Sequence, residues 1–218
     1  MEEPVGTQLH SPKQQAAVTP GRRFPHVQQF LNMNRVVVIG SSASRKTTVS
    51  RQLAASLDVP LLELDAIFHQ ADWGQLPEDQ FRATVDEFTA VDRWVVDGNY
   101  TSHGMREILW PRADTVVWLD LPRSVVMRQV IRRTLRRMTN REELWNANRE
   151  PWTNLYSLEP EKNIVLWAWT RFAGVTVKYE TCMTDGSWSH AVVHRLRTRA
   201  DVTAFLGLPL EDSPIVLN

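Results

Sequence analysis

The residues with the clearest chemical meaning stand together directly after a short apolar run. Val36 to Ile39 lead into Gly40, and after four small or polar residues come Arg45, Lys46 and Thr47. A glycine, four variable residues, a second glycine, a lysine and a serine or threonine form a loop that binds phosphates. Only the second glycine of that pattern is missing here, because its place is taken by Arg45.

Each part of this loop has a role toward a polyphosphate. The backbone N–H groups and the positive end of the following helix face the phosphates. Lys46 reaches the outer phosphates, and the Thr47 hydroxyl takes Mg²⁺. The sequence therefore predicts that ATP is bound by Gly40, Ser41, Ser42, Ala43, Ser44, Arg45, Lys46, Thr47 and Thr48.

Arg45 weakens this prediction for a physical reason. Glycine tolerates positive φ and lets the backbone approach phosphate oxygens, whereas a side chain with a Cβ strains such a turn by about 1–3 kcal/mol. A guanidinium is also a strong phosphate ligand and can replace lost backbone contacts. We therefore expect weakened nucleotide binding, not its loss.

Two predicted strands end in an aspartate, Asp97 and Asp120. Ligands of open parallel sheets bind beyond the carboxyl ends of the strands, where a carboxylate can hold the water shell of Mg²⁺. Asp97 is favoured because a tight polar turn, Gly98 to Tyr100, follows it; its alternative role is that of a turn former or helix cap. For Asp120 the turn-forming role is favoured, since Leu-Pro follows. We predict Thr47 and Asp97 as the magnesium residues.

Asp65 follows a third predicted strand and is a candidate for orienting or deprotonating an acceptor hydroxyl. Phe68, His69 and Trp73 come next, and they suit either stacking on a ring of the acceptor or packing at the edge of the core.

A predicted helix over residues 123–138 is rich in arginine. Guanidinium groups along one side repel one another unless anions compensate, which favours a surface that faces phosphates over an ordinary solvated face. The arginines of that side are Arg128, Arg132, Arg133, Arg136 and Arg137, and the opposite apolar stripe is predicted to be Met127, Ile131, Leu135 and Met138.

The polar segment after this helix contains Arg141 and Arg149 and predicts a lid, at about residues 139–160, that closes over phosphates. We assign Arg132, Arg133, Arg141 and Arg149 to the charge that develops during phosphoryl transfer, with Lys46 and Asp65 as the other catalytic candidates.

The chain has 218 residues, 25 basic and 25 acidic side chains and one cysteine, Cys182. This length suits one α/β domain. The balanced charge gives no argument for nucleic acid or a membrane surface as a partner. A single cysteine excludes an intrachain disulfide and, with no apolar run of membrane-spanning length, predicts a cytoplasmic protein.

The chain divides into three predicted parts: a disordered arm over residues 1–32, a domain over residues 33–206 and a tail over residues 207–218. The arm is rich in proline and glutamine and lacks apolar periodicity. It is either a stretch before the true start at Met33 or a partner-binding tail that uses Arg22 and Arg23.

Strand-like and helix-like segments alternate through the predicted domain, which favours a parallel sheet with crossover helices. The predicted strands are residues 35–39, 61–64, 94–97, 115–119 and 191–196. The predicted helices are residues 46–57, 77–90, 105–110, 123–138, 160–182 and 200–206. This layout predicts an α/β fold of the nucleoside monophosphate kinase type, with five parallel strands, flanking helices and a small lid.

Together, several motifs resemble the adenylate kinase-like P-loop proteins known as DNA topology modulation proteins. They are the loop at residues 40–48, Glu-Leu-Asp at 63–65, Trp-Val-Val-Asp-Gly-Asn-Tyr at 94–100, the strand with Asp-Leu-Pro-Arg at 114–123 and Glu-Leu-Trp-Asn-x-Asn-Arg-Glu at 143–150. The resemblance spans about residues 34–206. It implies a P-loop NTPase fold, ATP with Mg²⁺, and phosphoryl transfer to a small acceptor. The family pattern has glycine at Ala43 and Arg45; Ala43 is a mild change if its φ is ordinary.

The leading interpretation is an ATP-dependent kinase-like phosphotransferase, that is, a transferase acting on a nucleotide or another small acceptor. The first alternative is a catalytically impaired nucleotide-binding protein with a regulatory role, which Arg45 supports. A nucleic-acid-binding protein that uses the arginine helix is the weaker alternative. The acceptor and the oligomeric state stay open.

Overall fold

The structure is a computed structural model that describes residues 30, 32–100, 103–140, 143–144, 146, 148, 159 and 163–207. The candidate residues Arg141 and Arg149, nearly all of the predicted arm and tail, and most of the predicted lid lie outside these described residues.

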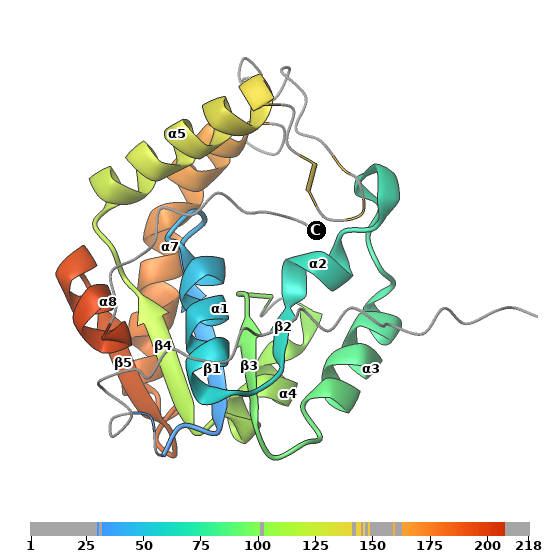
Figure 1. The fold of residues 1–218 in the computed structure, drawn as a ribbon, viewed down its shortest axis with the longest axis vertical. Helices are drawn as coiled ribbons and strands as arrows, with labels where there is room; N and C mark the ends of the chain where they lie inside the picture. Colours follow the sequence, from blue (N-terminus) through green and yellow to red (C-terminus); the bar gives the residue numbers. More distant parts are fainter. Residues whose placement is uncertain are drawn as a thin grey trace, which may run out of the picture.

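Five parallel strands form one sheet in the order β2-β3-β1-β4-β5 (Figure 1). Apolar runs with both faces covered are typical of a parallel sheet, and β1, β3 and β4 are such runs. The strands are β1 (Arg35–Gly40), β2 (Leu61–Glu63), β3 (Trp94–Asp97), β4 (Thr115–Leu119) and β5 (Val192–Leu196).

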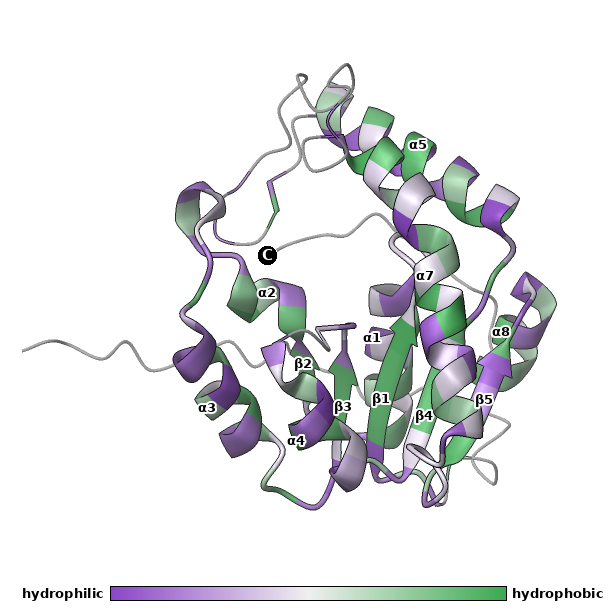
Figure 2. Cartoon of the chain, turned by 180° about the vertical axis from the view of Figure 1, so that it is seen from behind, coloured by the Kyte–Doolittle hydropathy of each residue, from purple (hydrophilic) through white to green (hydrophobic). Residues whose placement is uncertain are grey.

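Helices cover both faces of the sheet. The longer helices are α1 (Lys46–Leu57), α3 (Glu78–Phe88), α4 (Met105–Arg112), α5 (Arg123–Asn140), α7 (Ile164–Thr184) and α8 (Arg199–Leu206), and two short ones are α2 (Leu64–Phe68) and η2 (Ala71–Trp73). Because side chains alternate along a strand, Val36 and Val38 pack with α1 and α8, whereas Val37 and Ile39 pack with α3, α4 and α7. The apolar strands thus lie between two helical layers (Figure 2).

The predicted α/β class, the five parallel strands and the flanking helices are confirmed. A loop of phosphate-binding sequence joins the central strand β1 to α1, so the chain has a P-loop NTPase fold. The short helices α2 and η2 were not predicted. Among the described residues, no helix combines the length and the apolar composition needed to cross a membrane.

The predicted apolar stripe of α5 is partly wrong. Ile131 and Leu135 are 44 % and 45 % exposed. The buried side of the helix is formed instead by Val126, Met127, Val130, Thr134, Arg137 and Met138. Two stripes offset by one residue both fit the helical period, and the contact with Ala168 of α7 selects the one that contains Val126 and Val130.

Asp120, at the end of β4, belongs to an ion-pair network. Arg195 of β5 donates to Asp120 Oδ2 over 2.8 Å and to Glu180 Oε1 over 2.7 Å. The same guanidinium lies 4.1 Å from the ring centroid of Trp118. This environment agrees with the structural role preferred for Asp120.

Phe30, within the predicted arm, is buried and packs edge-on against Phe205 of α8, with ring centroids 5.9 Å apart. The packed part of the chain therefore includes a residue before Met33.

The core between α3 and the sheet is expected to carry much of the stability. Phe81 is fully buried and packs against Phe68 and Tyr100, so Phe81→Ala is expected to lower the free energy of unfolding by about 3–5 kcal/mol. Urea denaturation measures this change. Val91→Ala, at a position that is 50 % exposed, serves as the control, and an equal loss in both variants would contradict the assignment of this core.

Candidate functional site

The loop between β1 and α1 has left-handed backbone at Ala43 and Arg45, the two positions where the family pattern has glycine. Ala43 has φ 57° and Arg45 has φ 72°. The condition under which Ala43 would be a mild change, an ordinary φ, is therefore not met. Each of the two residues adopts a conformation that costs an L-residue about 1–2 kcal/mol. The loop nevertheless keeps the αL turns from which backbone N–H groups converge on an anion.

Helix α1 begins directly at the loop. Its N-cap residue, Arg45, makes no side-chain capping hydrogen bond, and its first turn carries no acidic residue. The first N–H groups of a helix have no intrahelical partner and carry partial positive charge. The start of α1 therefore suits an anion such as a phosphate group.

Lys46 lies across the loop that precedes it. Its Nζ donates to the carbonyl oxygens of Gly40 over 3.0 Å and Ser41 over 3.1 Å. Burial lowers the pKa of Lys46, while the nearby charges of Asp97 and Asp65 raise it. Its ammonium is thus placed inside the site, close to the carboxylates of the neighbouring strands.

Thr47 donates its hydroxyl to Asp97 Oδ2 over 2.6 Å. Burial raises the pKa of Asp97 to about 6, against the opposing effects of Lys46 and the Thr47 hydrogen bond. The other oxygen, Oδ1, is buried and has no hydrogen-bond partner among the described residues. A hydroxyl and a carboxylate with a spare oxygen are the donor set that holds hydrated Mg²⁺ beside phosphates, so these two residues fit that ion.

Asp65, at the start of α2, faces the same space. Tyr100 donates its hydroxyl to Asp65 Oδ1 over 2.6 Å, and the Tyr100 oxygen lies 3.5 Å from His69 Nε2. Burial lowers the pKa of His69, which favours its neutral form. The carboxylate of Asp65 acts on the pKa values of both Lys46 and Asp97, so it belongs to the same electrostatic site.

Of the two aromatic candidates, Phe68 is buried in the core, whereas Trp73 is 40 % exposed. The Trp73 ring stands edge-on to His69, with centroids 5.5 Å apart. Two asparagines from the polar segment after α5 hold this stretch: Asn148 accepts from Trp73 N and donates to Gln70 O, both over 2.8 Å, and Asn146 donates to His69 O. The end of α2 and η2 are thereby joined to the segment that follows the arginine helix.

Lys46, Thr47 and Asp65 line one cavity of about 300 Å³, whereas Asp97, His69 and Trp73 are not among its lining residues. Helix α5 crosses beyond the carboxyl ends of the strands (Figures 1 and 2) and contributes most of the arginines. The cavity is lined by Ser42, Ala43, Arg45, Lys46, Thr47, Thr48, Arg51, Glu63, Asp65, Gln129, Arg132, Arg133, Arg136, Arg137, Leu144 and Arg199. Arg133 Nη2 donates to Ser42 Oγ over 3.4 Å, which brings the arginine helix to the loop.

Four arginines of the predicted side, Arg132, Arg133, Arg136 and Arg137, line the cavity, whereas Arg128 is exposed and does not line it. That this side faces phosphates stays a prediction. Of the predicted loop residues, Gly40, Ser41 and Ser44 do not line the cavity. Sequence reasoning missed Arg199 and the pair Arg51–Glu63, which is bidentate over 2.5 and 3.0 Å. The four-residue step from Thr47 to Arg51 along α1 is the signal that places Arg51 on the same face.

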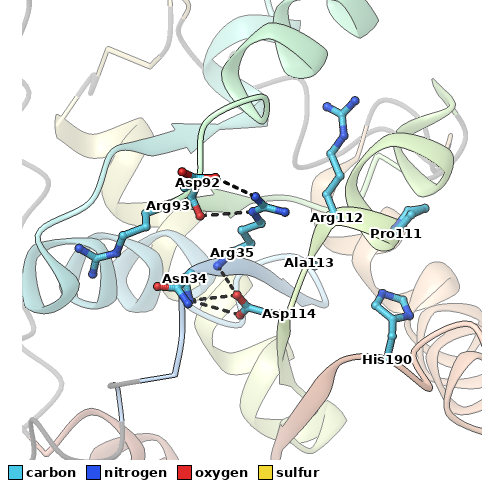
Figure 3. A pocket seen from close by; sticks show the side chains of 9 residues that line it. All are labelled: Asn34, Arg35, Asp92, Arg93, Pro111, Arg112, Ala113, Asp114 and His190. Atoms are coloured by element: carbon cyan, nitrogen blue, oxygen red, sulfur yellow. Dashed lines mark hydrogen bonds and ion pairs between the residues drawn. The ribbon is translucent and has the colours of Figure 1, made fainter.

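A larger hollow, of about 500 Å³, lies at the opposite end of the sheet (Figure 3). Its charged groups already bind one another: Arg35 pairs with Asp92 over 3.1 Å, and Asp114 accepts from the backbone N–H groups of Asn34 and Arg35. These contacts tie the first strand to its neighbours. The smaller cavity, where groups converge on open space, is therefore the candidate site.

Among the described residues, no cluster of three or more His, Cys, Asp or Glu side chains is arranged to hold a metal ion. A magnesium ion held by Thr47 and Asp97 would therefore need further oxygens from phosphate and water.

The proteins to which this chain is similar include shikimate kinases and a gluconokinase. No known family model matches the chain. A stretch of 99 residues is 32 % identical to shikimate kinase of Corynebacterium diphtheriae, covering 39 % of this chain and 56 % of that protein. The chain thus matches only about half of the length of this relative.

Solved structures of similar fold include a shikimate kinase from Acinetobacter baumannii in complex with shikimate, with a TM-score of 0.48, 17 % identity and coverage of 83 % of this chain and 92 % of that one. A gluconokinase from Sinorhizobium meliloti has a TM-score of 0.34 and 21 % identity, with coverage of 75 % and 99 %. The fold assignment rests on the strand order and the loop. The resemblance to DNA topology modulation proteins stays a prediction.

The raised pKa of Asp97 predicts a pH-dependent cost of folding. Because the folded value of about 6 exceeds the ordinary 3.8, the folded state binds more protons than the unfolded state between these values, and stability falls as pH rises through that window. Asp97→Asn removes this cost. We expect the variant to exceed the parent in stability by about 3 kcal/mol above about pH 7 and to match it below about pH 3.

Urea denaturation at several pH values measures this difference. Asp92→Asn is the control, because its carboxylate is 96 % exposed. A difference between parent and Asp97→Asn that stays constant with pH would contradict the assignment of a buried, strained carboxylate.

Proposed function

We propose that this protein is a P-loop kinase-like phosphotransferase that binds ATP with Mg²⁺ and transfers the γ-phosphoryl group to a small acceptor. The observation that carries the proposal is the 2.6 Å contact between Thr47 and Asp97 beside Lys46, at the wall of a cavity lined by arginines. A phosphate-binding loop, a magnesium residue pair and a group of cations opposite them are the parts that phosphoryl transfer requires.

In this proposal Lys46 and the first N–H groups of α1 bind the phosphates, and Thr47 and Asp97 hold the magnesium ion. Bound Mg²⁺ supplies neutralisation of charge on the phosphate oxygens. Arg132 and Arg133 stabilise the charge of the transferring group, a role that the sequence also predicts for Arg141 and Arg149. Water exclusion comes from the walls formed by α5 and Leu144.

Asp65 is the residue proposed to meet the acceptor. Its Oδ1 is held by Tyr100, which fixes the orientation of the carboxylate and leaves Oδ2 for the acceptor. An acceptor hydroxyl placed between Asp65 and Lys46 donates its proton to this carboxylate as its oxygen attacks the γ-phosphorus of ATP. The bond from that phosphorus to the bridging oxygen breaks, and ADP is the leaving group. The likeness to shikimate kinase and gluconokinase supports a small molecule as the acceptor.

The second candidate function is a nucleotide-binding protein with impaired turnover and a regulatory role. The positive φ values of Ala43 and Arg45 favour it, because a Cβ at these positions crowds the space in which backbone and phosphate approach each other. Both functions need the phosphate site, and they differ in turnover. Measurements on variants of the loop therefore test them. The nucleic-acid alternative gains less support, since four arginines of α5 line the cavity.

Removal of the loop lysine tests the phosphate site itself. A nucleotide at 100 times its dissociation constant stabilises the folded state by about 2.7 kcal/mol. We expect MgATP to raise the unfolding temperature of the parent and to leave that of Lys46→Ala unchanged. Lys178→Ala, which removes an exposed lysine from α7, is expected to respond as the parent does. A parent that no nucleotide stabilises would exclude both candidate functions.

Arg45→Gly tests whether the arginine impairs the site, as the second candidate requires. Glycine relieves the left-handed strain, so this variant is expected to gain about 1 kcal/mol of stability. The phosphotransferase proposal expects the parent to bind MgATP in calorimetric titration, and Arg45→Gly to bind at least as tightly. A gain of turnover in Arg45→Gly would favour the impaired nucleotide binder. Absence of binding in the parent, restored by Arg45→Gly, would exclude both functions and identify Arg45 as the residue that disables the ATP site. A large loss in Arg45→Gly would identify Arg45 as a phosphate ligand, and Ala43→Gly controls for loop flexibility.

A further inference from the structure

Asn99 lies two residues beyond Asp97, and the proposed function gives it no role. Its Oδ1 accepts a hydrogen bond from Gly40 N over 3.1 Å, and its Nδ2 donates to Gly40 O over 2.6 Å. A single side chain therefore binds both polar groups of the residue at which β1 turns into the phosphate loop.

The sheet explains why these groups need a partner. The pairing of β1 with β3 ends at Val38 and Asp97, whereas its pairing with β4 continues to Gly40 and Leu119. Gly98 N still donates to Val38 O over 3.2 Å, but the next polar groups of β1 on this side face a strand that has ended. A carboxamide offers one donor and one acceptor, as a peptide does, so Asn99 continues the ladder by one step.

Gly40 also requires this support for its conformation. Its φ is 149°, and an added Cβ would lie 2.6 Å from Leu119 O and 2.9 Å from Ser44 Oγ. The entry to the loop is therefore a tight turn that only glycine fits, and the two hydrogen bonds from Asn99 fix the orientation of its peptide groups.

Lys46 shares the same acceptor, because its Nζ also donates to Gly40 O, over 3.0 Å. When this ammonium turns to a phosphate, Gly40 O loses one of its two donors, and Asn99 Nδ2 remains. A carbonyl left without any partner would oppose that movement. Asn99 is thus placed to let the lysine leave the loop.

Tyr179 of α7 fixes the carboxamide in turn. Its hydroxyl donates to Asn99 Oδ1 over 3.0 Å. Tyr179 is 1 % exposed, and its ring packs against Trp118 and Trp188 with centroid distances of 5.7 and 5.9 Å. Two donors, Tyr179 OH and Gly40 N, therefore hold Oδ1 in place, which leaves Nδ2 directed at Gly40 O.

We propose that Asn99, oriented by Tyr179, is a positioning residue of the phosphate loop: it fixes the Gly40 peptide and keeps its carbonyl bonded when Lys46 moves to a phosphate. This inference rests on the proposed function, since it assigns residues that support the same site. Helix α7 also packs on the arginine helix α5 through Ala168, so one helix supports both walls of the cavity.

Tyr179→Phe tests the proposal by removing one oxygen and keeping the ring. We expect calorimetric titration to show that MgATP and tripolyphosphate, a probe without a nucleoside, both bind about tenfold more weakly. We also expect hydrogen exchange of the Gly40 amide, followed by NMR, to become at least about tenfold faster, while the amides of Val36 to Ile39 keep their protection. A merely structural loss would speed exchange along all of β1.

Asn99→Asp provides a second variant, because it removes the donor to Gly40 O and keeps the size of the side chain. Its loss of tripolyphosphate binding is expected to exceed that of Tyr179→Phe. Thr181→Val is the matched control: it removes a hydroxyl of α7 that donates only to Val177 O of the same helix over 3.0 Å, and it is expected to leave binding and Gly40 exchange unchanged.

The outcomes distinguish the positioning role of Asn99 and Tyr179 from the proposed function of the protein. Parental affinity together with unchanged Gly40 exchange in Tyr179→Phe would overturn the positioning role, even if MgATP binds the parent. A parent that binds neither probe would overturn the proposed function. In that case Gly40 exchange in the two variants still decides whether Asn99 and Tyr179 fix the loop entry.

Discussion

A carboxylate in the interior of a protein must be balanced by donors or cations close to it, because water no longer solvates its charge. Asp97 is such a group: it is 5 % exposed and ends β3, directly beside the central strand. The Lys46 ammonium and the Thr47 hydroxyl stabilise the negative charge of Asp97. Both residues belong to the start of α1. The loop must therefore return the chain from the end of β1 to the end of β3 within a few residues, and this requirement fixes the tight turn at Gly40.

The same requirement explains why the loop keeps its shape without two of its expected glycines. Both ends of the loop are held by packing, since β1 is central in the sheet and Val49 and Leu53 of α1 are fully buried. Burial of such side chains contributes about 1.5–3 kcal/mol each, which exceeds the strain of about 1–2 kcal/mol at each left-handed residue. Tertiary packing thus imposes the αL conformation on Ala43 and Arg45. The two substitutions therefore strain the backbone of the loop and do not change its conformation.

The charged residues divide into two kinds by what surrounds them. Arg195 contacts Asp120, Glu180 and the Trp118 ring, so its charge is compensated by groups of the fold itself. Arg132 and Arg133 of α5 line a cavity that also contains the phosphate loop. A cationic wall opposite a loop of this type raises the local concentration of anions, and this arrangement supports the proposal that the site binds a polyphosphate.

The sequence by itself determined the strands, the main helices and the position of the phosphate loop, because these depend on local patterns: apolar runs, helical periodicity and the spacing of Gly40, Lys46 and Thr47. It also singled out Asp97 and Asp65, since aspartates at strand ends of a parallel sheet meet at one edge. It did not determine which of two offset stripes of α5 is buried, because both satisfy the same period.

Only the tertiary structure decided the φ of Ala43, the roles of Arg51 and Arg199, and the contacts of Asn99 with Gly40 and Tyr179. These depend on groups far apart in the chain, such as Asn99 and Tyr179, which are separated by 80 residues. A local pattern carries no information about such pairs. They form because the sheet order brings the end of β3 next to the start of the loop, and because packing of α7 against the sheet brings the Tyr179 hydroxyl to Asn99.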